Sequence, residues 1–224
     1  MFDYTKANYH EKRHKDLLDD FELQIAWGDF ADTAYFADAK KNYDILEFGS
    51  GLGNNLLTVK RYANVIGIEP SILGRKEAEK NGIKCYESLD KVDQNKKFDI
   101  ILCRHVLEHV ENPRAILLSL QERLKAEGKL ILVLPLDKLS QKPKKNDIDH
   151  HLFCWNPRTI INLLTISGFE KSNYRYEAFN ARKKLLPLHK VFGPSFYIKL
   201  IRIVGKITNA KELIIESKKK CIKT

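Results

Sequence analysis

Short, largely apolar runs separated by longer amphipathic stretches limit most strongly how this chain can fold. The five runs are YDILEF (43–48), NVIGIE (64–69), IKCYES (83–88), FDIILC (98–103) and KLILVLP (129–135). Strands that are apolar throughout are covered on both faces, as in parallel sheets packed between helices. The alternation therefore predicts a doubly wound α/β domain with a mostly parallel sheet. A chain of 224 residues is long enough for one sizeable core.

The stretches between and after these runs predict the helices and the last strands. We expect helices over 54–63, 71–82, 112–128 and 156–168, with Ser71 and Asn156 as N-caps. The strand-like FEKSNYRYEAF and KELIIES lie near the C-terminal end, and the basic, apolar segment 194–208 lies between them. Residues 1–40 are amphipathic and are also expected to be helical.

Three alternating glycines follow the first apolar run, in DILEFGSGLGNNLLTV. Gly49, Gly51 and Gly53 allow unusual backbone angles and let a ligand approach the main chain at the carboxyl end of a strand. Asn54 occupies the position of the final glycine in the dinucleotide motif, and no Gly-Lys-Ser/Thr of a P-loop follows. The turn thus predicts a ligand site of another kind.

Two acidic residues, Glu47 and Glu69, indicate what kind of ligand this site binds. Glu47, just before the glycines, would repel a pyrophosphate but would favour a cationic ligand. Glu69 ends the second run, where an acid can accept both ribose hydroxyls of an adenosyl group; its alternative is an exposed acid at a strand end. S-adenosylmethionine is an adenosyl ligand with a positive ammonium and sulfonium, and it is therefore the expected cofactor.

These motifs resemble those of the class I S-adenosylmethionine-dependent methyltransferases, in particular the branch that modifies quinones and cell-surface saccharides. The matching segments are LEFGSGLGNN, IGIEPS, FDIILCRHVLEHVENP, LKAEGKLILVLP and HHLFCWNPRTIINLLTISGFE. The resemblance implies a Rossmann-like, seven-stranded sheet whose last strand, KELIIES, runs antiparallel, with helices on both faces. It also implies an N-terminal helical lid (1–40) on a methyltransferase domain (41–224), with the basic helix 194–208 inserted before the last strand.

The resemblance also implies a set of cofactor contacts. The methionine part would lie on Glu47, Gly49, Ser50, Gly51 and Gly53, with Asn54 next to them, and the ribose on Glu69. Pro70 and Ser71 would flank the adenosine, and Ser88 and Leu89 would line the adenine, although the aspartate common at that place is missing. Cys103, Arg104 and His105 would face the sulfonium.

Histidines are the candidate bases, since methyl transfer to a hydroxyl also requires removal of its proton. His105 follows the fourth strand, and His150 and His151 follow the fifth, so these three are the candidate catalytic residues. His109 is expected to hold the strand–helix junction. His105 and His109 have a spacing that could hold zinc, but no third ligand is evident, and no metal is predicted.

The loop NDIDHH and the aromatic residues leave alternatives open. Asp147, Asp149 and the two histidines of that loop could form an acid–base pair, a metal site or a solvated cap of the next helix. Six aromatic residues are candidates to roof the acceptor pocket, with ordinary core packing as the alternative: Tyr4, Tyr9, Trp27, Tyr35, Phe36 and Trp155.

Charge and cysteine content bear on partners and compartment. The formal net charge is +10, which fits either a solvated lysine-rich surface or an anionic partner. The four cysteines are scattered without CxxC pairs, and neither a secretory signal nor a membrane span is evident, so a cytoplasmic protein is expected. Segment 194–208 either packs on the sheet or contacts the anionic inner surface of a membrane.

Several functions fit these observations. The leading interpretation is O-methylation of a small molecule or a lipid-linked saccharide. The positive charge also permits an RNA methyltransferase, although nucleic acid is the less favoured partner. A non-catalytic protein that binds S-adenosylmethionine is a further alternative. Glu47 and Asn54 disfavour an NAD-dependent oxidoreductase, and CRHVLE replaces the Asp/Asn-Pro-Pro-Tyr/Phe motif of DNA amine methyltransferases. The acceptor and the oligomeric state are not defined.

Overall fold

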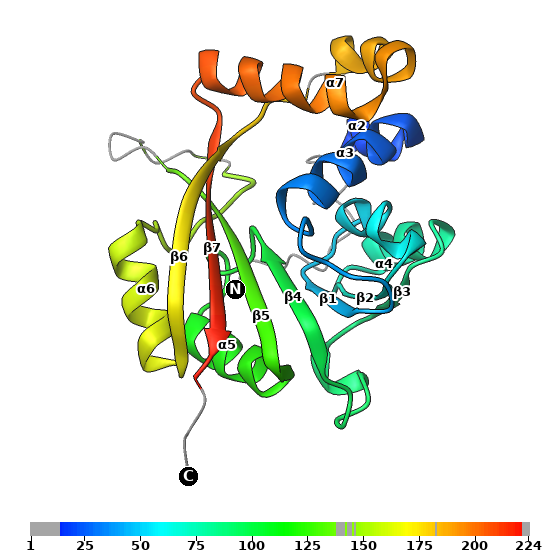
Figure 1. Ribbon diagram of the computed structural model, residues 1–224. Coiled ribbons are helices and arrows are strands. Elements are labelled where there is room, and N and C mark those ends of the chain that lie inside the picture. Colours follow the sequence, from blue (N-terminus) through cyan, green and yellow to red (C-terminus); the bar gives the residue numbers. More distant parts are fainter. Residues whose placement is uncertain (1–13, 138–141, 143–144, 146, 182, 221–224) are drawn as a thin grey trace.

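The computed structural model describes residues 14–137, 142, 145, 147–181 and 183–220. Its centre is a seven-stranded sheet in the order β3-β2-β1-β4-β5-β7-β6 (Figure 1). The strands are β1 (Asp44–Phe48), β2 (Asn64–Ile68), β3 (Lys84–Tyr86), β4 (Phe98–Arg104), β5 (Leu124–Pro135), β6 (Phe169–Ala178) and β7 (Lys211–Lys219). β7 pairs antiparallel with both β5 and β6, and the other pairs are parallel. The predicted seven-stranded sheet with an antiparallel last strand is confirmed.

The helices lie on both sides of this sheet, which confirms the predicted layers (Figure 1). They are α2 (Lys15–Leu18), α3 (Phe21–Ala34), α4 (Ile72–Lys80), α5 (Pro113–Glu122), α6 (Pro157–Ile166) and α7 (Leu186–Ile207). Short 3-10 turns are η1 (Asn54–Leu56), η2 (Val59–Arg61), η3 (Leu89–Lys91) and η4 (Lys183–Leu185). The predicted caps Ser71 and Asn156 accept hydrogen bonds from the main-chain N–H groups of Gly74 and Thr159.

Neighbouring residues of the central strands supply two separate cores, because successive side chains of a strand point to opposite faces. Ile45 of β1 packs in one core with α3, α7 and the 3-10 turns η1 and η2. Leu46, its neighbour, packs in the other core with α5 and α6. The pairs Ile100/Ile101, Ile131/Leu132 and Ile214/Ile215 divide in the same way. This explains why the strands read as continuously apolar.

Two predicted helices differ from the structure. The stretch 54–63 forms η1 and η2 instead of a regular helix; its two asparagines and its β-branched Thr58 and Val59 are weak helix formers. The helix expected over 112–128 ends at Glu122. Arg123 then turns into the protein, where its guanidinium donates to the carbonyls of Leu89 and Val92 at 2.9 and 2.8 Å, and β5 begins at the next residue.

The basic helix is longer than the predicted 194–208. It begins at Leu186 and bends at Gly193, which has φ 76° and ψ 173° and precedes Pro194. In Figure 1, α7 lies across the top of the molecule, from the upper end of β7 to above α3, and it follows β6 and precedes β7 in the chain. No helix in the described ranges is long and apolar enough to cross a membrane.

Candidate active site

A cavity of about 550 Å³ opens where the parallel strands β1, β2 and β4 end. Its floor is the glycine turn after β1 and the loop after β4, and α2 and α3 form its wall. The residues that line it are His14, Asp16, Leu17, Leu23, Trp27, Gly49, Ser50, Gly51, Leu52, Asn54, Asn55, Glu69, Pro70, Arg104, His105, Val106, Glu108, His109, Val110, Asp149, His151 and Ala181. Ligands of open α/β sheets bind at this end of the strands.

The glycine turn requires its glycines. Gly49, Gly51 and Gly53 have φ of 80°, 54° and 79°, in the left-handed region that favours glycine. A Cβ on Gly49 would also lie 2.2 Å from Cγ2 of Val106. The turn is fixed to β2 by Glu69, whose carboxylate accepts from the N–H of Gly51 at 2.9 Å and of Ser71 at 2.8 Å. Glu69 therefore joins the turn to the start of α4.

Glu47 lies beneath this turn with a half-satisfied carboxyl group. The side chain is completely buried. Oε1 accepts from the amide of Asn55 at 2.6 Å, whereas Oε2 is buried and has no hydrogen-bond partner in the described ranges. Burial raises the pKa of Glu47 to about 8. A cationic group brought into the cavity would favour the ionised form of this carboxyl group.

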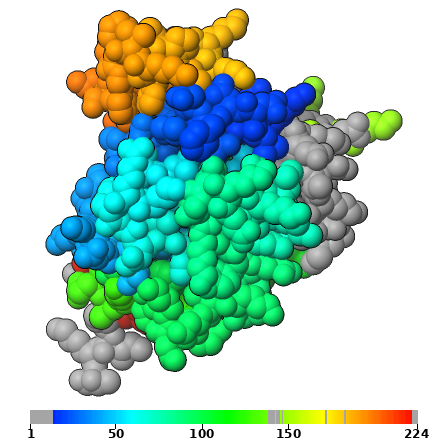
Figure 2. All heavy atoms as spheres, turned by 90° about the vertical axis from the view of Figure 1, so that its right-hand side faces the viewer, coloured from blue at the N-terminus to red at the C-terminus, as the bar shows by residue number. Residues whose placement is uncertain are grey.

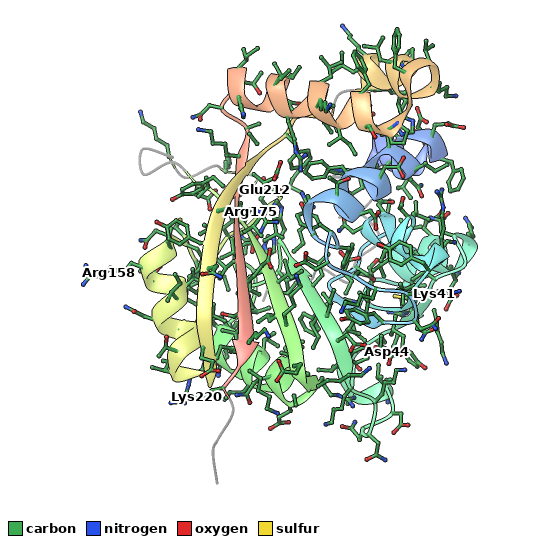
Figure 3. All side chains as sticks on the ribbon, in the orientation of Figure 1. Lys41, Asp44, Arg158, Arg175, Glu212 and Lys220 are labelled. Carbon is green, nitrogen blue, oxygen red and sulfur yellow. The ribbon has the colours of Figure 1, made fainter. Side chains whose placement is uncertain are left out.

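On the other side of the cavity, Arg104 at the end of β4 joins residues from three elements. Its guanidinium forms an ion pair with Glu212, at the start of β7, and donates to the hydroxyl of Tyr35 at 3.2 Å. The Tyr35 hydroxyl donates in turn to Glu212 at 2.9 Å. The buried Glu212 keeps a lowered pKa of about 2 despite its burial, because Arg104 stabilises its charge. Figure 3 shows Glu212 toward the upper end of β7 and Asp44 toward the lower end of the sheet.

His105 follows Arg104 in the chain and also lies close to Glu212. Its φ of 53° is unusual for a residue with a side chain. Its Nε2 lies 3.0 Å from Oε1 of Glu212. Burial and the neighbouring Arg104 lower the pKa of His105, so that the ring is neutral at pH 7. A neutral imidazole in the cavity wall can accept a proton from a bound hydroxyl group.

Glu108, His109 and His151 form a second cluster in the cavity wall. Each offers one ligand atom, and these atoms lie within 4.8 Å of one another. Glu108 is fully buried, neither of its carboxylate oxygens has a hydrogen-bond partner in the ranges described, and burial raises its pKa to about 8. Nδ1 of His151 lies 2.7 Å from Asp137, an arrangement that orients a histidine for a metal or a proton acceptor. The cluster can therefore hold a divalent cation, although the sequence predicted none.

The structure places the predicted site residues in two groups. Those that line the cavity are Gly49, Ser50, Gly51, Asn54, Glu69, Pro70, Arg104, His105 and His151. The remaining predicted residues, Glu47, Gly53, Ser71, Ser88, Leu89, Cys103 and His150, are not part of its lining. Glu47, Gly53, Ser71 and Cys103 are buried, and His150 is exposed. His105 and His151 thus share one cavity, and His150 does not reach it.

The aromatic candidates also separate. Trp27 lines the cavity, under the guanidinium of Arg104, whose carbon lies 5.2 Å from the ring centre. Tyr35 and Phe36 are buried in the core, and Trp155 stacks on Phe153 with 5.4 Å between ring centres. Tyr4 and Tyr9 lie outside the described residues.

Sequence reasoning missed Glu108, Glu212, Asp137 and Asn55. Two of them carried a usable signal. Glu108 stands beside His109 in the loop after the fourth strand, and Glu212 directly precedes the apolar run Leu213–Ile215, where a buried acid needs a partner. The involvement of Asp137 and Asn55 depends on how the chain folds back on itself, which no local pattern shows.

Comparison with known proteins identifies the family of this chain and supports its fold. The ubiquinone biosynthesis O-methyltransferase of Rickettsia typhi is 22% identical over 149 residues, which cover 59% of this chain and 60% of that protein. The chain thus spans less than two thirds of that relative. A crystal structure of a methyltransferase from Thermotoga maritima has a TM-score of 0.63 and 17% identity, and covers 95% of this chain and 99% of its own.

A third similar structure is the plantazolicin methyltransferase, which was solved with S-adenosylhomocysteine. It has a TM-score of 0.58 and 19% identity, and covers 96% of this chain and 88% of its own. Likeness at this identity concerns the fold. The family is shown by sequence, since the methyltransferase domain model matches residues 12–173, more than half of the chain. The chain therefore belongs to the methyltransferase domain family.

Proposed function

We propose that this protein transfers a methyl group from S-adenosylmethionine to a hydroxyl oxygen of a small molecule. The observation that carries the proposal is the buried Oε2 of Glu47, which has no hydrogen-bond partner among the described residues and belongs to the residue two positions before the first glycine of the turn. A buried carboxylate oxygen without a partner is costly, and a cationic ligand relieves that cost. S-adenosylmethionine brings an electrophilic methyl group on a positive sulfonium.

The donor half of the cavity consists of the glycine turn and Glu69. The carboxylate of Glu69 accepts from the main-chain N–H groups of Gly51 and Ser71, which holds it at the end of the second strand, where an acid can accept from the ribose hydroxyls of an adenosyl ligand. We assign the methionine part to the turn beside Glu47. We assign the adenine contact to Ser88 and Leu89, which follow Tyr86 of β3, although neither residue lines the cavity.

The reactive end is assigned to the loop after β4. His105, neutral at pH 7, is the proposed base for the acceptor hydroxyl. Glu212 forms an ion pair with Arg104 and neutralises its positive charge, and Oε1 of Glu212 lies 3.0 Å from Nε2 of His105. Without that neutralisation, the guanidinium would repel a cationic donor. His151, oriented by Asp137, is the second candidate for acceptor contact.

The class of acceptor is inferred from the cavity wall and from the relatives. Leu17, Leu23 and Trp27 give the wall on the α2–α3 side an apolar and aromatic character. These helices act as the lid of the proposed site. Such a wall suits an acceptor with an aromatic or lipid portion, and the ubiquinone biosynthesis methyltransferases are named for a product of that kind. A lipid-linked saccharide at a membrane surface is the other acceptor class that we propose.

The test is transfer of a labelled methyl group to a panel of phenols, saccharides, amines and RNA, with and without EDTA. We expect label on a phenol or saccharide, and a loss of at least tenfold for His105→Asn. His150→Asn, an exposed neighbour of the site, is the matched control and should keep full activity. Label on RNA alone, or none with any acceptor while the cofactor product binds, would overturn the proposed acceptor class. Loss of activity in EDTA would assign the Glu108–His109–His151 cluster to a cation.

A further inference from the structure

Helix α7 carries large apolar side chains on its outer surface. Val191, Phe192 and Phe196 are 72%, 58% and 47% exposed, and Ile203 and Ile207 are 55% and 79% exposed. The rings of Phe192 and Phe196 lie 4.9 Å apart across the bend at Gly193, so the apolar surface continues through the bend. We call these five residues the α7 outer face. Exposed apolar residues gathered in one place mark an interaction site.

The charge of this region has one sign. Between Glu177 and Glu212 the sequence has no acidic residue, but it has eight basic ones: Arg182, Lys183, Lys184, Lys190, Lys199, Arg202, Lys206 and Lys211. Lys183, Lys190 and Arg202 form ion pairs with Asp20, Glu22 and Glu177. None of the ion pairs in the described structure uses Lys184, Lys199 or Lys206, all of which are exposed.

The other side of α7 is fixed to the protein, so the outer face is a rigid surface. Tyr197, Ile198 and Ile201 are buried in the same core as α3. Nε2 of His189 lies 2.8 Å from the carboxylate of Asp29 on α3, which also accepts from the hydroxyl of Thr58 at 2.8 Å. Figure 2 shows α7, in orange, as a projection beyond the blue N-terminal helices and the body of the molecule.

The α7 outer face also lies at the cavity end of the molecule. α3, on which α7 packs, supplies Leu23 and Trp27 to the cavity wall, and Ala181, just before α7, lines the same cavity. A surface that contacts the outer face would thus lie near the side of the cavity that the lid covers. Figure 1 shows this end of the sheet opposite the end from which the C-terminus leaves.

We propose that the α7 outer face binds the anionic surface of a lipid bilayer. Apolar residues flanked by lysines, without acidic residues, are complementary to a negatively charged headgroup layer over hydrocarbon. The phenylalanines and isoleucines enter the headgroup region, and Lys184, Lys199 and Lys206 contact the phosphates. This inference deepens the proposed function: the idea that the membrane supplies a lipid-borne acceptor rests on that function. Binding to the membrane itself does not require methyl transfer.

The test is flotation of the full chain with vesicles of phosphatidylcholine alone or with phosphatidylglycerol, at low and high salt. We expect binding to the anionic vesicles that is weakened at high salt. Phe192→Ser/Phe196→Ser should reduce the bound fraction at least tenfold, and Lys199→Glu/Lys206→Glu should have a similar effect. The matched control is Tyr174→Ser/Tyr176→Ser, a ring pair of 53% and 52% exposure on the face of β6 opposite to Glu177, the partner of Arg202 in α7.

The outcomes separate the alternatives. Absence of wild-type binding to anionic vesicles, or equal binding by wild type and both α7 variants, would overturn the proposal. So would a wild-type dimer that the phenylalanine variant loses, if no vesicle is bound, because the face would then be a contact between copies of the chain. Binding of S-adenosylhomocysteine is measured on the same samples. Its loss with intact vesicle binding would contradict the proposed function and leave membrane binding standing.

Discussion

The two halves of the cavity are built in different ways, although both lie at the same end of the sheet. On the donor side, Glu69 fixes Gly51 and Ser71, which are 18 and 2 residues away in the chain. On the acceptor side, Glu212 holds Tyr35 and Arg104, which are 177 and 108 residues away. The donor side is thus a local motif, while the acceptor side forms only when the lid helix, β4 and β7 have come together.

The largest effect should come from breaking the local half alone. Gly49→Ala places a Cβ 2.2 Å from Val106 at a φ of 80°, and should weaken binding of S-adenosylhomocysteine at least 100-fold by calorimetry. Gly193→Ala is the matched control, since Gly193 has φ 76° but nothing within 4 Å of the added Cβ. It should bind the ligand as wild type does and lose about 1–3 kcal/mol of stability, because φ 76° with ψ 173° is a backbone region that essentially only glycine adopts. If both variants lost the same ligand affinity, backbone strain and not the closeness of Val106 would explain the weaker binding.

The next effect should come from the distant half. Glu212→Gln leaves the largely buried side chain of Arg104 without its charge partner, which costs up to about 3–5 kcal/mol of folding stability. We expect a clear fall in the thermal midpoint and a loss of methyl transfer of at least 30-fold, with the affinity for S-adenosylhomocysteine, which lacks the sulfonium charge, changed less than threefold.

Glu216→Gln is the control for that variant, because Glu216 is on the same strand and its ion pairs with Lys129 and Arg175 are partly exposed. It should change the thermal midpoint only slightly. If Glu212→Gln abolished ligand binding and transfer together, the two halves would not be separable.

The third prediction concerns pH. The pKa of Glu47 is raised from 4.5 to about 8, so the folded protein retains a proton that the unfolded chain has lost between these values. Its contribution to the free energy of unfolding therefore falls as pH rises from about 4.5 to 8. A cationic donor favours the ionised carboxylate, and its affinity should rise by up to about tenfold per pH unit below pH 8. Calorimetry with S-adenosylmethionine between pH 6 and 8.5 measures this, and Glu47→Gln should flatten the profile. Parallel pH profiles for the wild type and Glu47→Gln would contradict the role assigned to Glu47.

The smallest effect should come from the histidine after β5. His151→Gln removes the ring held by Asp137 and should lower the rate of transfer by about three- to tenfold without changing donor affinity. His150→Gln changes an exposed residue and should have no measurable effect on the same rates. A larger loss of transfer rate for His150→Gln than for His151→Gln would contradict the assignment of the acceptor contact to His151.

The difference between the two halves also explains what sequence reasoning could reach. The mostly parallel sheet, the antiparallel β7 and the positions of the glycine turn and Glu69 followed from local patterns and from the family resemblance. The partner of Arg104 did not, because hydrogen bonds between residues more than 100 positions apart leave no periodic signal. The sequence predicts a helix over 54–63, but its asparagines and β-branched residues favour the shorter 3-10 turns that the structure has.

The most direct test of the central claim is calorimetric titration of the wild type and Glu69→Ala with S-adenosylhomocysteine, beside NAD and ATP. The account predicts micromolar binding of S-adenosylhomocysteine alone, weakened at least tenfold in the variant, because Glu69 both holds the glycine turn and offers the ribose acceptors. Binding of NAD or ATP in its place, or no binding by a protein that is shown to be folded, would contradict it.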